Sequence, residues 1–373
     1  MKLVIDIRMI NASGIGTYLK NILPEMIMAF NEVIVLGNKD EITKFEWSKQ
    51  VKIIEFHSKI YSLKEQILYP FIVPKCDVFW CPHFNFPILP VRAKKKLVTI
   101  HDVNHLAGVS PISKIKKKYA HLLFENAVRK VDLIFTVSEF SKKEIIKYTK
   151  AKPEKIKVVH CGVNASFFKK EKNSKNLKLP ENYILYVGNV KPHKNLIVLL
   201  KAYAMFSNEF KSKFKLLIVG KKQGFITQDN DIDNFIKNND LEKIVFFSGH
   251  VADSDLPIYY QKASLFVFPS LYEGFGLPIL EALAAKTIVI SSNASSLPEI
   301  GGNAVVYFEP ENHIELSQKI EECLESSIIN ERLEKERSTQ LQKFTWKKSI
   351  QNHLEAFSEI LNYPIKNNEK SPN

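Results

Sequence analysis

Two carboxylates stand eight residues apart in the stretch PSLYEGFGLPILEALAA, which runs from Pro269 to Ala285. Glu273 lies just before a Gly-x-Gly-x-Pro turn, and Glu281 lies in the helix-like run after it. Pro278 suits the first turn of a helix, so the N–H groups around Gly276, Leu277 and Ile279 are expected to be unpaired. Unpaired N–H groups at a helix start attract phosphate or a hydroxyl-rich sugar. An acidic residue one turn inside can accept paired hydrogen bonds from a ribose diol. The stretch therefore predicts a site for a phosphate with hydroxylated groups on either side of it, although an ordinary first-turn Glu that stabilises the helix dipole is the alternative for Glu281.

The elements that position these residues alternate between strand and helix in both halves of the chain. The expected strands are residues 2–8, 32–37, 51–57, 76–82, 95–102, 132–138 and 155–163 in the first half, and 183–189, 214–220, 243–249, 264–270, 287–292 and 304–310 in the second. This alternation predicts an α/β chain with two Rossmann-like, doubly wound domains. Ligands of such sheets bind beyond the carboxyl ends of the strands, so we expect a central cleft that both domains face.

Composition shifts indicate where the domains end. We expect an N-terminal domain over residues 1–164 and a C-terminal domain over residues 182–346. Residues 165–181 are rich in Lys and Asn with little periodicity, which is typical of a linker. A helix at about residues 347–363 is expected to pack back on the N-terminal domain, and residues 364–373 are expected to be a disordered tail.

Composition and charge exclude several classes of protein. The 373 residues are 45% hydrophobic, enough for two cores, but no apolar run reaches the roughly 18–20 residues of a membrane span. Asp6 and Arg8 interrupt the first apolar stretch, which argues against a signal peptide and for a cytoplasmic protein. The four cysteines are scattered without metal-ligand spacing, so we expect no metal site.

The chain carries a net charge of +13, with basic clusters at Arg92–Lys96 and Lys114–Phe124. The second cluster is typical either of an amphipathic helix on an anionic membrane surface or of a solvated lysine-rich face. No nucleic-acid motif and no interleaving of aromatic and basic residues accompanies the charge, so nucleic acid is not an expected partner.

An ordered set of motifs resembles the retaining glycosyltransferases of family 4, which have the GT-B fold. PSLYEGFGLPILEALA resembles their E-x7-E signature. ILYVGNVKPHKNLIVLLKAY, residues 184–203, is similar to the first strand–loop–helix of their C-terminal domain. IDIRMINASGIGTYLKNIL, residues 5–23, is similar to their N-terminal glycine loop, and the resemblance extends from about Lys2 to Glu359.

The resemblance implies a role for each residue of the signature. Glu273 would contact the donor sugar, and Glu281 would bind the ribose of the nucleotide. Backbone amides near Phe275, Gly276 and Leu277 would meet the sugar and the diphosphate. These assignments agree with the helix-start reasoning from the residues themselves.

The loop at residues 189–194 is implied to bind the diphosphate. Lys194 matches the family's phosphate-binding lysine, which stabilises negative charge on the leaving group. Asn189 stands where the family usually has an arginine, and His193 beside Lys194 is expected to contribute instead. Lys286 stands where a small residue usually follows the helix, so we expect an altered turn there.

The resemblance also implies that residues 1–164 form the acceptor-side domain and residues 182–346 the nucleotide-sugar donor domain, and it assigns residues of the N-terminal half. Gly14 and Gly16, expected to form a turn after the first strand, would approach the donor phosphates and the acceptor. His101 would face the donor sugar as a catalytic residue, together with Lys194 and Glu273. The alternative for His101 is a structural hydrogen-bonded pair with Asp102.

The implied activity is transfer of a hexose from a nucleotide-sugar with retention of configuration, with no cofactor beyond the donor and no essential metal. YVGNVKPHKN and SLYEGFGLPILEA resemble bacterial mannosyltransferases, which implies transfer of mannose from GDP-mannose to a hydroxyl of a polyprenyl-linked saccharide in surface polysaccharide, lipopolysaccharide or O-antigen biosynthesis. Such a protein would be peripheral on the inner face of the plasma membrane.

Other functions stay open or are disfavoured. The open ones are a rhamnosyl- or glucosyltransferase that uses a dTDP- or UDP-sugar, and a non-catalytic nucleotide-sugar-binding relative. A nicotinamide-dependent oxidoreductase shares the doubly wound sheets. It is disfavoured because the GIG turn at residues 14–16 lacks a third glycine and no acidic residue ends the second strand.

Overall fold

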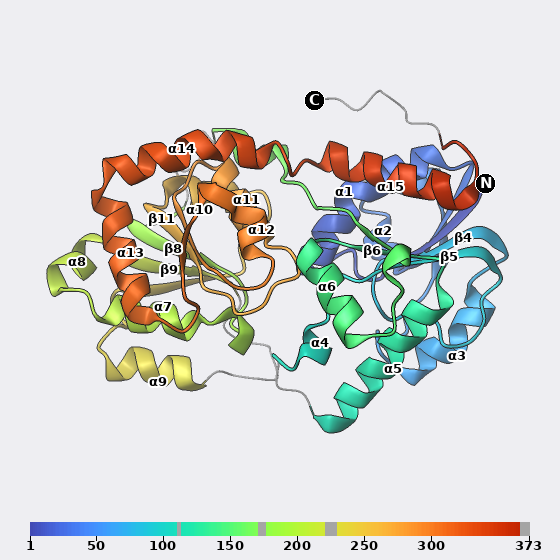
Figure 1. Ribbon diagram of the computed structural model, residues 1–373, viewed down its shortest axis with the longest axis horizontal. Coiled ribbons are helices and arrows are strands. Elements are labelled where there is room, and N and C mark those ends of the chain that lie inside the picture. Colours follow the sequence, from blue (N-terminus) through green and yellow to red (C-terminus); the bar gives the residue numbers. More distant parts are fainter. Residues whose placement is uncertain (110–112, 171–176, 221–229, 366–373) are drawn as a thin grey trace. The chain divides into compact units, whose positions relative to one another are not determined.

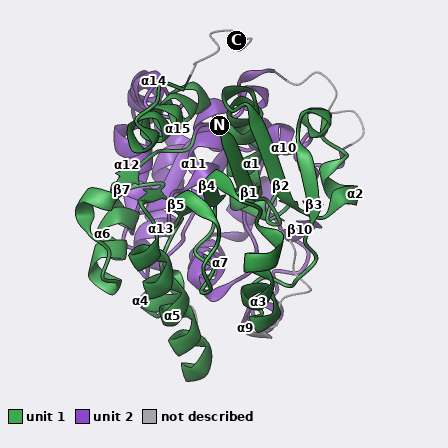
Figure 2. Cartoon of the chain, turned by 90° about the vertical axis from the view of Figure 1, so that its right-hand side faces the viewer, with its two compact units in different colours: residues 1–161, 346–373 green, residues 162–345 purple. Residues whose placement is uncertain are grey.

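The chain divides into two compact units (Figure 2). Unit 1 comprises Met1–Cys161 together with the chain from Trp346 onwards, and unit 2 comprises Gly162–Thr345. The computed structural model describes residues 1–109, 113–170, 177–220 and 230–365.

The expected linker falls within unit 2. It begins there with the 3-10 turn η3, Ala165–Phe168. Residues 171–176 of that linker and residues 366–373 of the expected tail lie outside the described residues.

Unit 1 is built on a seven-stranded parallel sheet. Its strand order is β3-β2-β1-β4-β5-β6-β7, with β1 Lys2–Asp6, β2 Glu32–Gly37, β3 Lys52–Glu55, β4 Cys76–Cys81, β5 Ala93–Thr99, β6 Leu133–Thr136 and β7 Ile156–Val158. The central strands are nearly continuous apolar runs, as parallel strands must be when helices cover both faces of the sheet.

Helices cover both faces of this sheet. They are α1 Ser13–Ala29, α2 Lys39–Ile42, α3 Leu63–Ile72, α4 Asn104–Ala107, α5 Lys114–Lys130, α6 Glu139–Tyr148 and α15 Trp346–Leu361, with 3-10 turns η1 Glu46–Gln50 and η2 Pro153–Lys155. Successive strand residues point to opposite faces, and on β4 Trp80 packs on Phe357 of α15 whereas Phe79 packs on Tyr69 of α3. The helix after Thr345 is therefore part of the unit 1 fold, and Phe357 also contacts Phe30 just after α1.

Unit 2, like unit 1, is built on a parallel sheet, which here has six strands. Figure 1 shows its helices and strands. The order is β10-β9-β8-β11-β12-β13, with β8 Tyr183–Val187, β9 Lys215–Val219, β10 Val245–Gly249, β11 Leu265–Phe268, β12 Val289–Ser292 and β13 Val306–Phe308. The helices are α7 Leu196–Ala204, α8 Asn208–Lys213, α9 Asn230–Asn238, α10 Leu256–Lys262, α11 Leu277–Ala284, α12 Leu297–Gly301, α13 His313–Glu325 and α14 Ser327–Leu341, with 3-10 turns η4 Pro192–Lys194 and η5 Gly302–Ala304.

The predicted fold class, two parallel doubly wound sheets, is confirmed. In unit 2, β9 and β10 lie on one side of β8 in the sheet, whereas β11, β12 and β13 lie on the other side. The strand order therefore reverses between the neighbouring strands β8 and β11. A crevice site of a doubly wound sheet forms where the loops after two such strands separate. In the described ranges, no helix combines the length and the apolar character needed to cross a bilayer.

Lys286 ends α11 in a regular turn, so the prediction of an altered turn is wrong. Its φ is +65°, its N–H donates to the carbonyl of Leu283, and the next N–H, of Thr287, donates to that of Ala282. This pair of bonds is the Schellman pattern, in which glycine is the preferred left-handed residue.

We therefore expect Lys286→Gly to stabilise the protein by about 1 kcal/mol, because glycine adopts positive φ without steric cost. Urea unfolding of both proteins measures the difference. Lys201→Gly, at an exposed site inside α7, is the matched control and should destabilise by about 0.7 kcal/mol. Equal destabilisation by both changes would contradict the prediction.

Candidate active site

The loop that carries Glu273 is fixed by serine residues of the next strand and loop. After β11, Ser292 Oγ donates to the carbonyl of Ser270 at 2.5 Å. The backbone N–H of Glu273 donates to Ser295 Oγ at 3.0 Å, and Ser296 Oγ lies 2.9 Å and 2.6 Å from the carbonyl oxygens of Glu273 and Phe275. Backbone hydrogen-bonding groups of the loop thus have side-chain partners, which hold it in one conformation.

Glu273 and Lys194 form an ion pair across two neighbouring strands. Lys194 Nζ lies 2.5 Å from Glu273 Oε1, and the two side chains are only 20% and 15% exposed. The ammonium also lies over the Phe268 ring, 5.5 Å from its centre. The turn η4 that carries Lys194 is tied to the β11 loop, because the N–H of Leu271 donates to the carbonyl of His193 at 2.8 Å. The fold therefore brings together a cation and a carboxylate that lie 79 residues apart in sequence.

The start of α11 lies next to this pair in sequence. Gly276 precedes the helix with φ +118°, a conformation that favours glycine, and a Cβ there would lie 3.0 Å from Leu297 Cδ2. Pro278 occupies the first turn as expected. Ile279, however, donates its N–H to the carbonyl of Gly276, so the expectation that this group is unpaired is wrong. The side chain of Phe275 is buried and packs on Phe344, so only backbone groups of Phe275 are suited to meet a ligand.

Glu281 is half-buried on α11 and hydrogen-bonded. Its Oε2 accepts from the hydroxyl of Tyr260 at 3.0 Å. Burial raises the pKa of Glu281 to about 7, the hydrogen bond from Tyr260 lowers it, and the nearby Asp253 raises it further. Because Glu281 lies beyond the first turn of α11, the alternative of a dipole-stabilising first-turn residue does not apply.

The loop after β8 approaches the loop after β9 closely. A Cβ on Gly220, whose φ is +156°, would lie 2.0 Å from the carbonyl oxygen of Gly188, so only glycine fits. Asn189 follows Gly188, and its carbonyl accepts from the hydroxyl of Tyr186 at 3.5 Å. Asn195, with φ +54°, donates to the carbonyl of Pro310 at 2.7 Å and fixes the chain just after Lys194.

His101 lies in unit 1, just beyond β5. Its Nε2 is 3.1 Å from the carbonyl oxygen of Pro82, and its ring meets the ring of Tyr18 edge-on at 5.0 Å. Burial lowers the pKa of His101, which favours the neutral imidazole. Asp102 accepts instead from the N–H of Asn104 at 2.9 Å, so each member of the suggested His–Asp pair has another partner.

Gly14 and Gly16 lie inside α1, so the expected turn at these residues is wrong. The helix begins at Ser13, and the N–H of Gly16 donates to the carbonyl of Ala12. A Cβ on Gly16 would lie 2.5 Å from the carbonyl oxygen of Ile10, whereas one on Gly14 would meet nothing within 4 Å. Gly16 therefore allows a close backbone approach within unit 1, and Gly14 lies on the exposed first turn.

Sequence reasoning missed a buried ionic cluster at the carboxyl end of β1. Arg8 lies 2.6 Å from Asp6 and 2.8 Å from Glu65, and it donates to the hydroxyl of Tyr69 at 2.6 Å. Burial raises the pKa of Glu65, although Arg8 opposes this shift. The sequence feature that could have revealed this cluster is the pair of charged residues, Asp6 and Arg8, that interrupts the first apolar run.

A histidine beside this cluster was also missed. His83 Nδ1 is 3.0 Å from Asn85 Oδ1, and its Nε2 is 3.0 Å from the hydroxyl of Tyr61. Burial lowers the pKa of His83 to about 3, so the ring is neutral. Asn85 in turn donates to Glu65 at 3.3 Å, which joins His83 to the Arg8 cluster.

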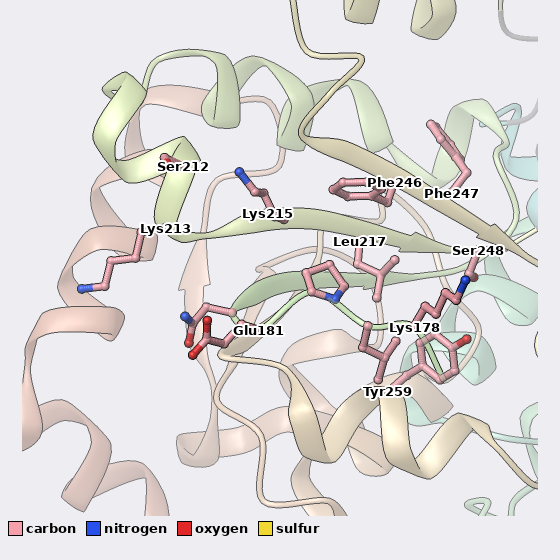
Figure 3. A pocket seen from close by; sticks show the side chains of 13 residues that line it. Lys178, Glu181, Ser212, Lys213, Lys215, Leu217, Phe246, Phe247, Ser248 and Tyr259 are labelled. Carbon is pink, nitrogen blue, oxygen red and sulfur yellow. The ribbon is translucent and has the colours of Figure 1, made fainter. Parts of the chain in front are cut away.

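A separate hollow of about 770 Å³ lies on unit 2 (Figure 3). Its lining includes Lys178, Lys215, Leu217, Phe246 and Tyr259. Lys178 precedes β8 and Lys215 begins β9, so the hollow extends over the amino ends of these strands, whereas Lys194 and Glu273 follow carboxyl ends. It is distinct from the site that the motifs predict, since it shares no lining residue with that site.

We expect Ser295→Ala to lower transfer activity about tenfold, because it leaves the N–H of Glu273 without its partner and an unpaired donor costs about 1–3 kcal/mol. Steady-state kinetics measures the loss of activity, and the cost of the unpaired donor should lower the unfolding midpoint by only a few degrees. Ser254→Ala, at an exposed serine of the same unit, is the control. Full activity of Ser295→Ala would show that the loop keeps its conformation without this bond.

Two Rossmann-like units, each built on a parallel doubly wound sheet, are the architecture of the GT-B class of glycosyltransferases. Residues 12–167 match the family described as Glycosyltransferase Family 4, and residues 167–340 match Glycosyl transferases group 1. The chain belongs to these glycosyltransferases, and the resemblance stated from the motifs is confirmed.

Among curated proteins, the chain is similar to bacterial O-antigen mannosyltransferases. It is 28% identical to O-antigen chain mannosyltransferase B of Escherichia coli over 72% of this chain and 71% of that protein. It is 32% identical to O-antigen chain mannosyltransferase RfbU of Salmonella typhimurium over 62% of this chain and 60% of that protein. It spans only 29% of the length of the serotype-specific mannosyltransferase WbdA of Escherichia coli.

Solved structures share the fold. A glycosyltransferase from Rickettsia africae is 22% identical with a TM-score of 0.71, covering 96% of this chain and 98% of that chain. Anabaena HepE in complex with UDP-glucose is 19% identical with a TM-score of 0.76, covering 96% of this chain and 100% of that chain. At these identities the comparison establishes the GT-B architecture of the two units.

Proposed function

We propose that the protein transfers mannose from GDP-mannose, with retention of configuration, to a hydroxyl of a polyprenyl-linked saccharide in surface polysaccharide biosynthesis. The observation that carries the proposal is the Lys194–Glu273 pair after the neighbouring strands β8 and β11 of unit 2, with Glu281 on the helix that follows. The similarity to two O-antigen mannosyltransferases supports mannose as the sugar. HepE, solved with UDP-glucose, supports the alternative of a UDP-sugar donor.

In the proposed reaction, the acceptor oxygen attacks the anomeric carbon on the face from which the diphosphate leaves. The bond from that carbon to the phosphate oxygen breaks, the new glycosidic bond forms, and the acceptor proton passes to the leaving phosphate oxygen. Negative charge grows on the diphosphate, where the ammonium of Lys194 and the N–H groups at the start of α11 would stabilise it. These groups supply the positive charge, so the proposal needs no essential metal.

The remaining residues orient the donor. The Glu273 carboxylate would accept hydrogen bonds from sugar hydroxyls, and the Glu281 carboxylate would accept them from the ribose diol. Asn189 and His193, in the same loop as Lys194, are proposed to contact the diphosphate. The catalytic role of His101 and the phosphate contacts of Gly14 and Gly16 stay predictions from the family resemblance.

Turnover with a panel of donors tests the proposal. GDP-mannose, UDP-glucose and dTDP-rhamnose are each supplied with an undecaprenyl-linked saccharide, and the product is identified by mass spectrometry and by the NMR coupling of its anomeric proton. We expect an α-linked mannoside from GDP-mannose. Product from another donor alone would overturn the assignment of the sugar. Binding of a donor without any turnover would indicate the non-catalytic relative.

A further inference from the structure

Helix α3 presents a row of large apolar side chains to solvent. Leu63, Ile67 and Phe71 recur at every fourth residue, so they share one face of the helix, and their exposed fractions are 69%, 58% and 82%. The opposite side of α3 is anchored in unit 1, because Glu65, Gln66 and Tyr69 are buried. A row of this kind costs free energy in water and marks an interaction surface.

A loop links α3 to α5, which also exposes apolar side chains. Gln66 of α3 accepts from the N–H of Ile88 at 2.8 Å, and Asn126 of α5 donates to the carbonyls of Phe86 and Pro87 at 3.0 Å. The loop at residues 86–88 therefore ties α3 to α5 on one side of the sheet. Leu89, next to this loop, and Leu122 and Ile115 on α5 are also exposed.

The outward-facing surface of α3 and α5 carries positive charge. The exposed charged side chains of the two helices are all basic: Lys64, Lys114, Lys116, Lys117, Lys118, Arg129 and Lys130. The two acidic residues of these helices do not oppose them, because Glu65 is buried against Arg8 and Glu125 is only partly exposed and lies 3.5 Å from Arg129. A second copy of this chain would present the same positive charge, so charge complementarity selects an anionic partner.

The other basic cluster of the sequence contributes less. Residues 92–96 lie at the amino end of β5, where Lys94 is 2.7 Å from Asp77. Few large apolar side chains accompany that cluster, whereas α3 and α5 combine apolar residues with lysines. Apolar groups that enter the acyl boundary, together with cations that meet anionic headgroups, are the signature of a membrane-surface helix.

We propose that the outer face of α3 and α5 docks on an anionic phospholipid bilayer, with Leu63, Ile67 and Phe71 inserted below the headgroups. The proposal deepens the proposed function, on which its biological meaning rests, by naming the surface that would bring the enzyme to a lipid-linked acceptor. It also identifies α3, which carries only one exposed lysine, as the inserting element.

Co-sedimentation with vesicles tests the proposal without donor or acceptor. The full chain is mixed with vesicles of phosphatidylcholine alone, or with vesicles in which about 30% of the lipid is the anionic phosphatidylglycerol. We expect binding to the anionic vesicles only. Leu63→Ser/Ile67→Ser/Phe71→Ser should reduce the bound fraction at least tenfold. The matched control, Met205→Ser/Ile314→Ser/Ile328→Ser, removes three exposed apolar residues of unit 2 and should bind normally.

Insertion is distinguished from electrostatic adsorption by a fluorescent side chain. Phe71→Trp should be quenched by brominated lipid in the anionic vesicles, and Phe168→Trp, at an exposed phenylalanine of unit 2, should not. Circular dichroism checks that each variant is folded.

Three outcomes would overturn the proposal: no binding to anionic vesicles, equal binding by the α3 variant, or a wild-type dimer that the α3 variant converts to a monomer. The last would identify the face as an interface between copies of the chain. Turnover with a detergent-solubilised acceptor should be unchanged in the α3 variant, so failure of docking and failure of the proposed transfer are separable.

Discussion

Lys194→Ala is expected to lower kcat by about 10²–10³-fold, because the variant loses the cation that we propose stabilises charge on the leaving diphosphate. Groups that act on developing charge in a dry site contribute more to the transition state than to the ground state. We therefore expect KM for the donor to change far less than kcat. Steady-state kinetics with GDP-mannose, or with whichever donor the panel identifies, provides the measurement.

Two further variants separate catalysis from structure. Lys194→Ala also leaves the Glu273 carboxylate without its partner in a mostly buried place, which can destabilise the loop. Lys194→Ala/Glu273→Gln removes that unpaired charge, and we expect its unfolding midpoint to recover while its activity does not. Lys201→Ala, at an exposed lysine of α7, is the control for loss of a positive charge from unit 2. If Lys194→Ala kept kcat within twofold of the wild type, the assigned role would be wrong.

Donor affinity is expected to rise about tenfold between pH 6 and pH 8, because in the proposed site the ribose diol donates to the ionised form of Glu281, whose pKa is about 7. Below that pKa the carboxyl is mostly protonated and is a poorer acceptor. The diphosphate of a nucleotide-sugar is a diester, so the ligand itself does not titrate in this range. Isothermal titration calorimetry across the pH series provides the affinities.

Variants of the same contact predict how the profile changes. Glu281→Gln cannot ionise, so its donor affinity should be independent of pH and about 10–100-fold weaker at pH 8, the loss expected for hydrogen bonds to a charged group. Tyr260→Phe removes the hydroxyl that favours the carboxylate, so the pKa of Glu281 should rise and the midpoint should move to higher pH. A wild-type affinity that is flat from pH 6 to pH 8 would refute the ribose contact or the raised pKa.

The pH dependence of stability shows whether a flat affinity means that Glu281 does not contact the ribose or that its pKa is not raised. The pKa of Glu281 is higher in the folded chain than the model-compound value of 4.5, so the folded state binds more protons between about pH 4.5 and pH 7. The stability of the wild type relative to Glu281→Gln should therefore fall as pH rises through that window. A difference in stability that does not depend on pH would show that the pKa is not raised, whatever the role of the contact.

The sequence by itself determined the two-sheet architecture and pointed to the segment in which we propose the donor site. Runs such as KLVID and LFVF are apolar throughout because parallel strands are buried on both faces, and that pattern is readable without a structure. Glu273, Gly276 and Glu281 lie within one short segment, so a local motif is sufficient to find them. The glycine at residue 276 also has a local cause, its positive φ at the helix start.

Only the tertiary structure decided which distant residues meet and what their environment does to them. The Lys194–Glu273 pair depends on β8 and β11 being neighbours, and the pKa of Glu281 depends on a tyrosine and on burial that α10 helps to provide. The Arg8–Glu65 cluster and the exposed row on α3 likewise arise from long-range packing, since α3 also has apolar residues, Leu68 and Ile72, that pack against the core. A sequence pattern reports the period of an element, whereas pairing, burial and exposure are set by its neighbours in space.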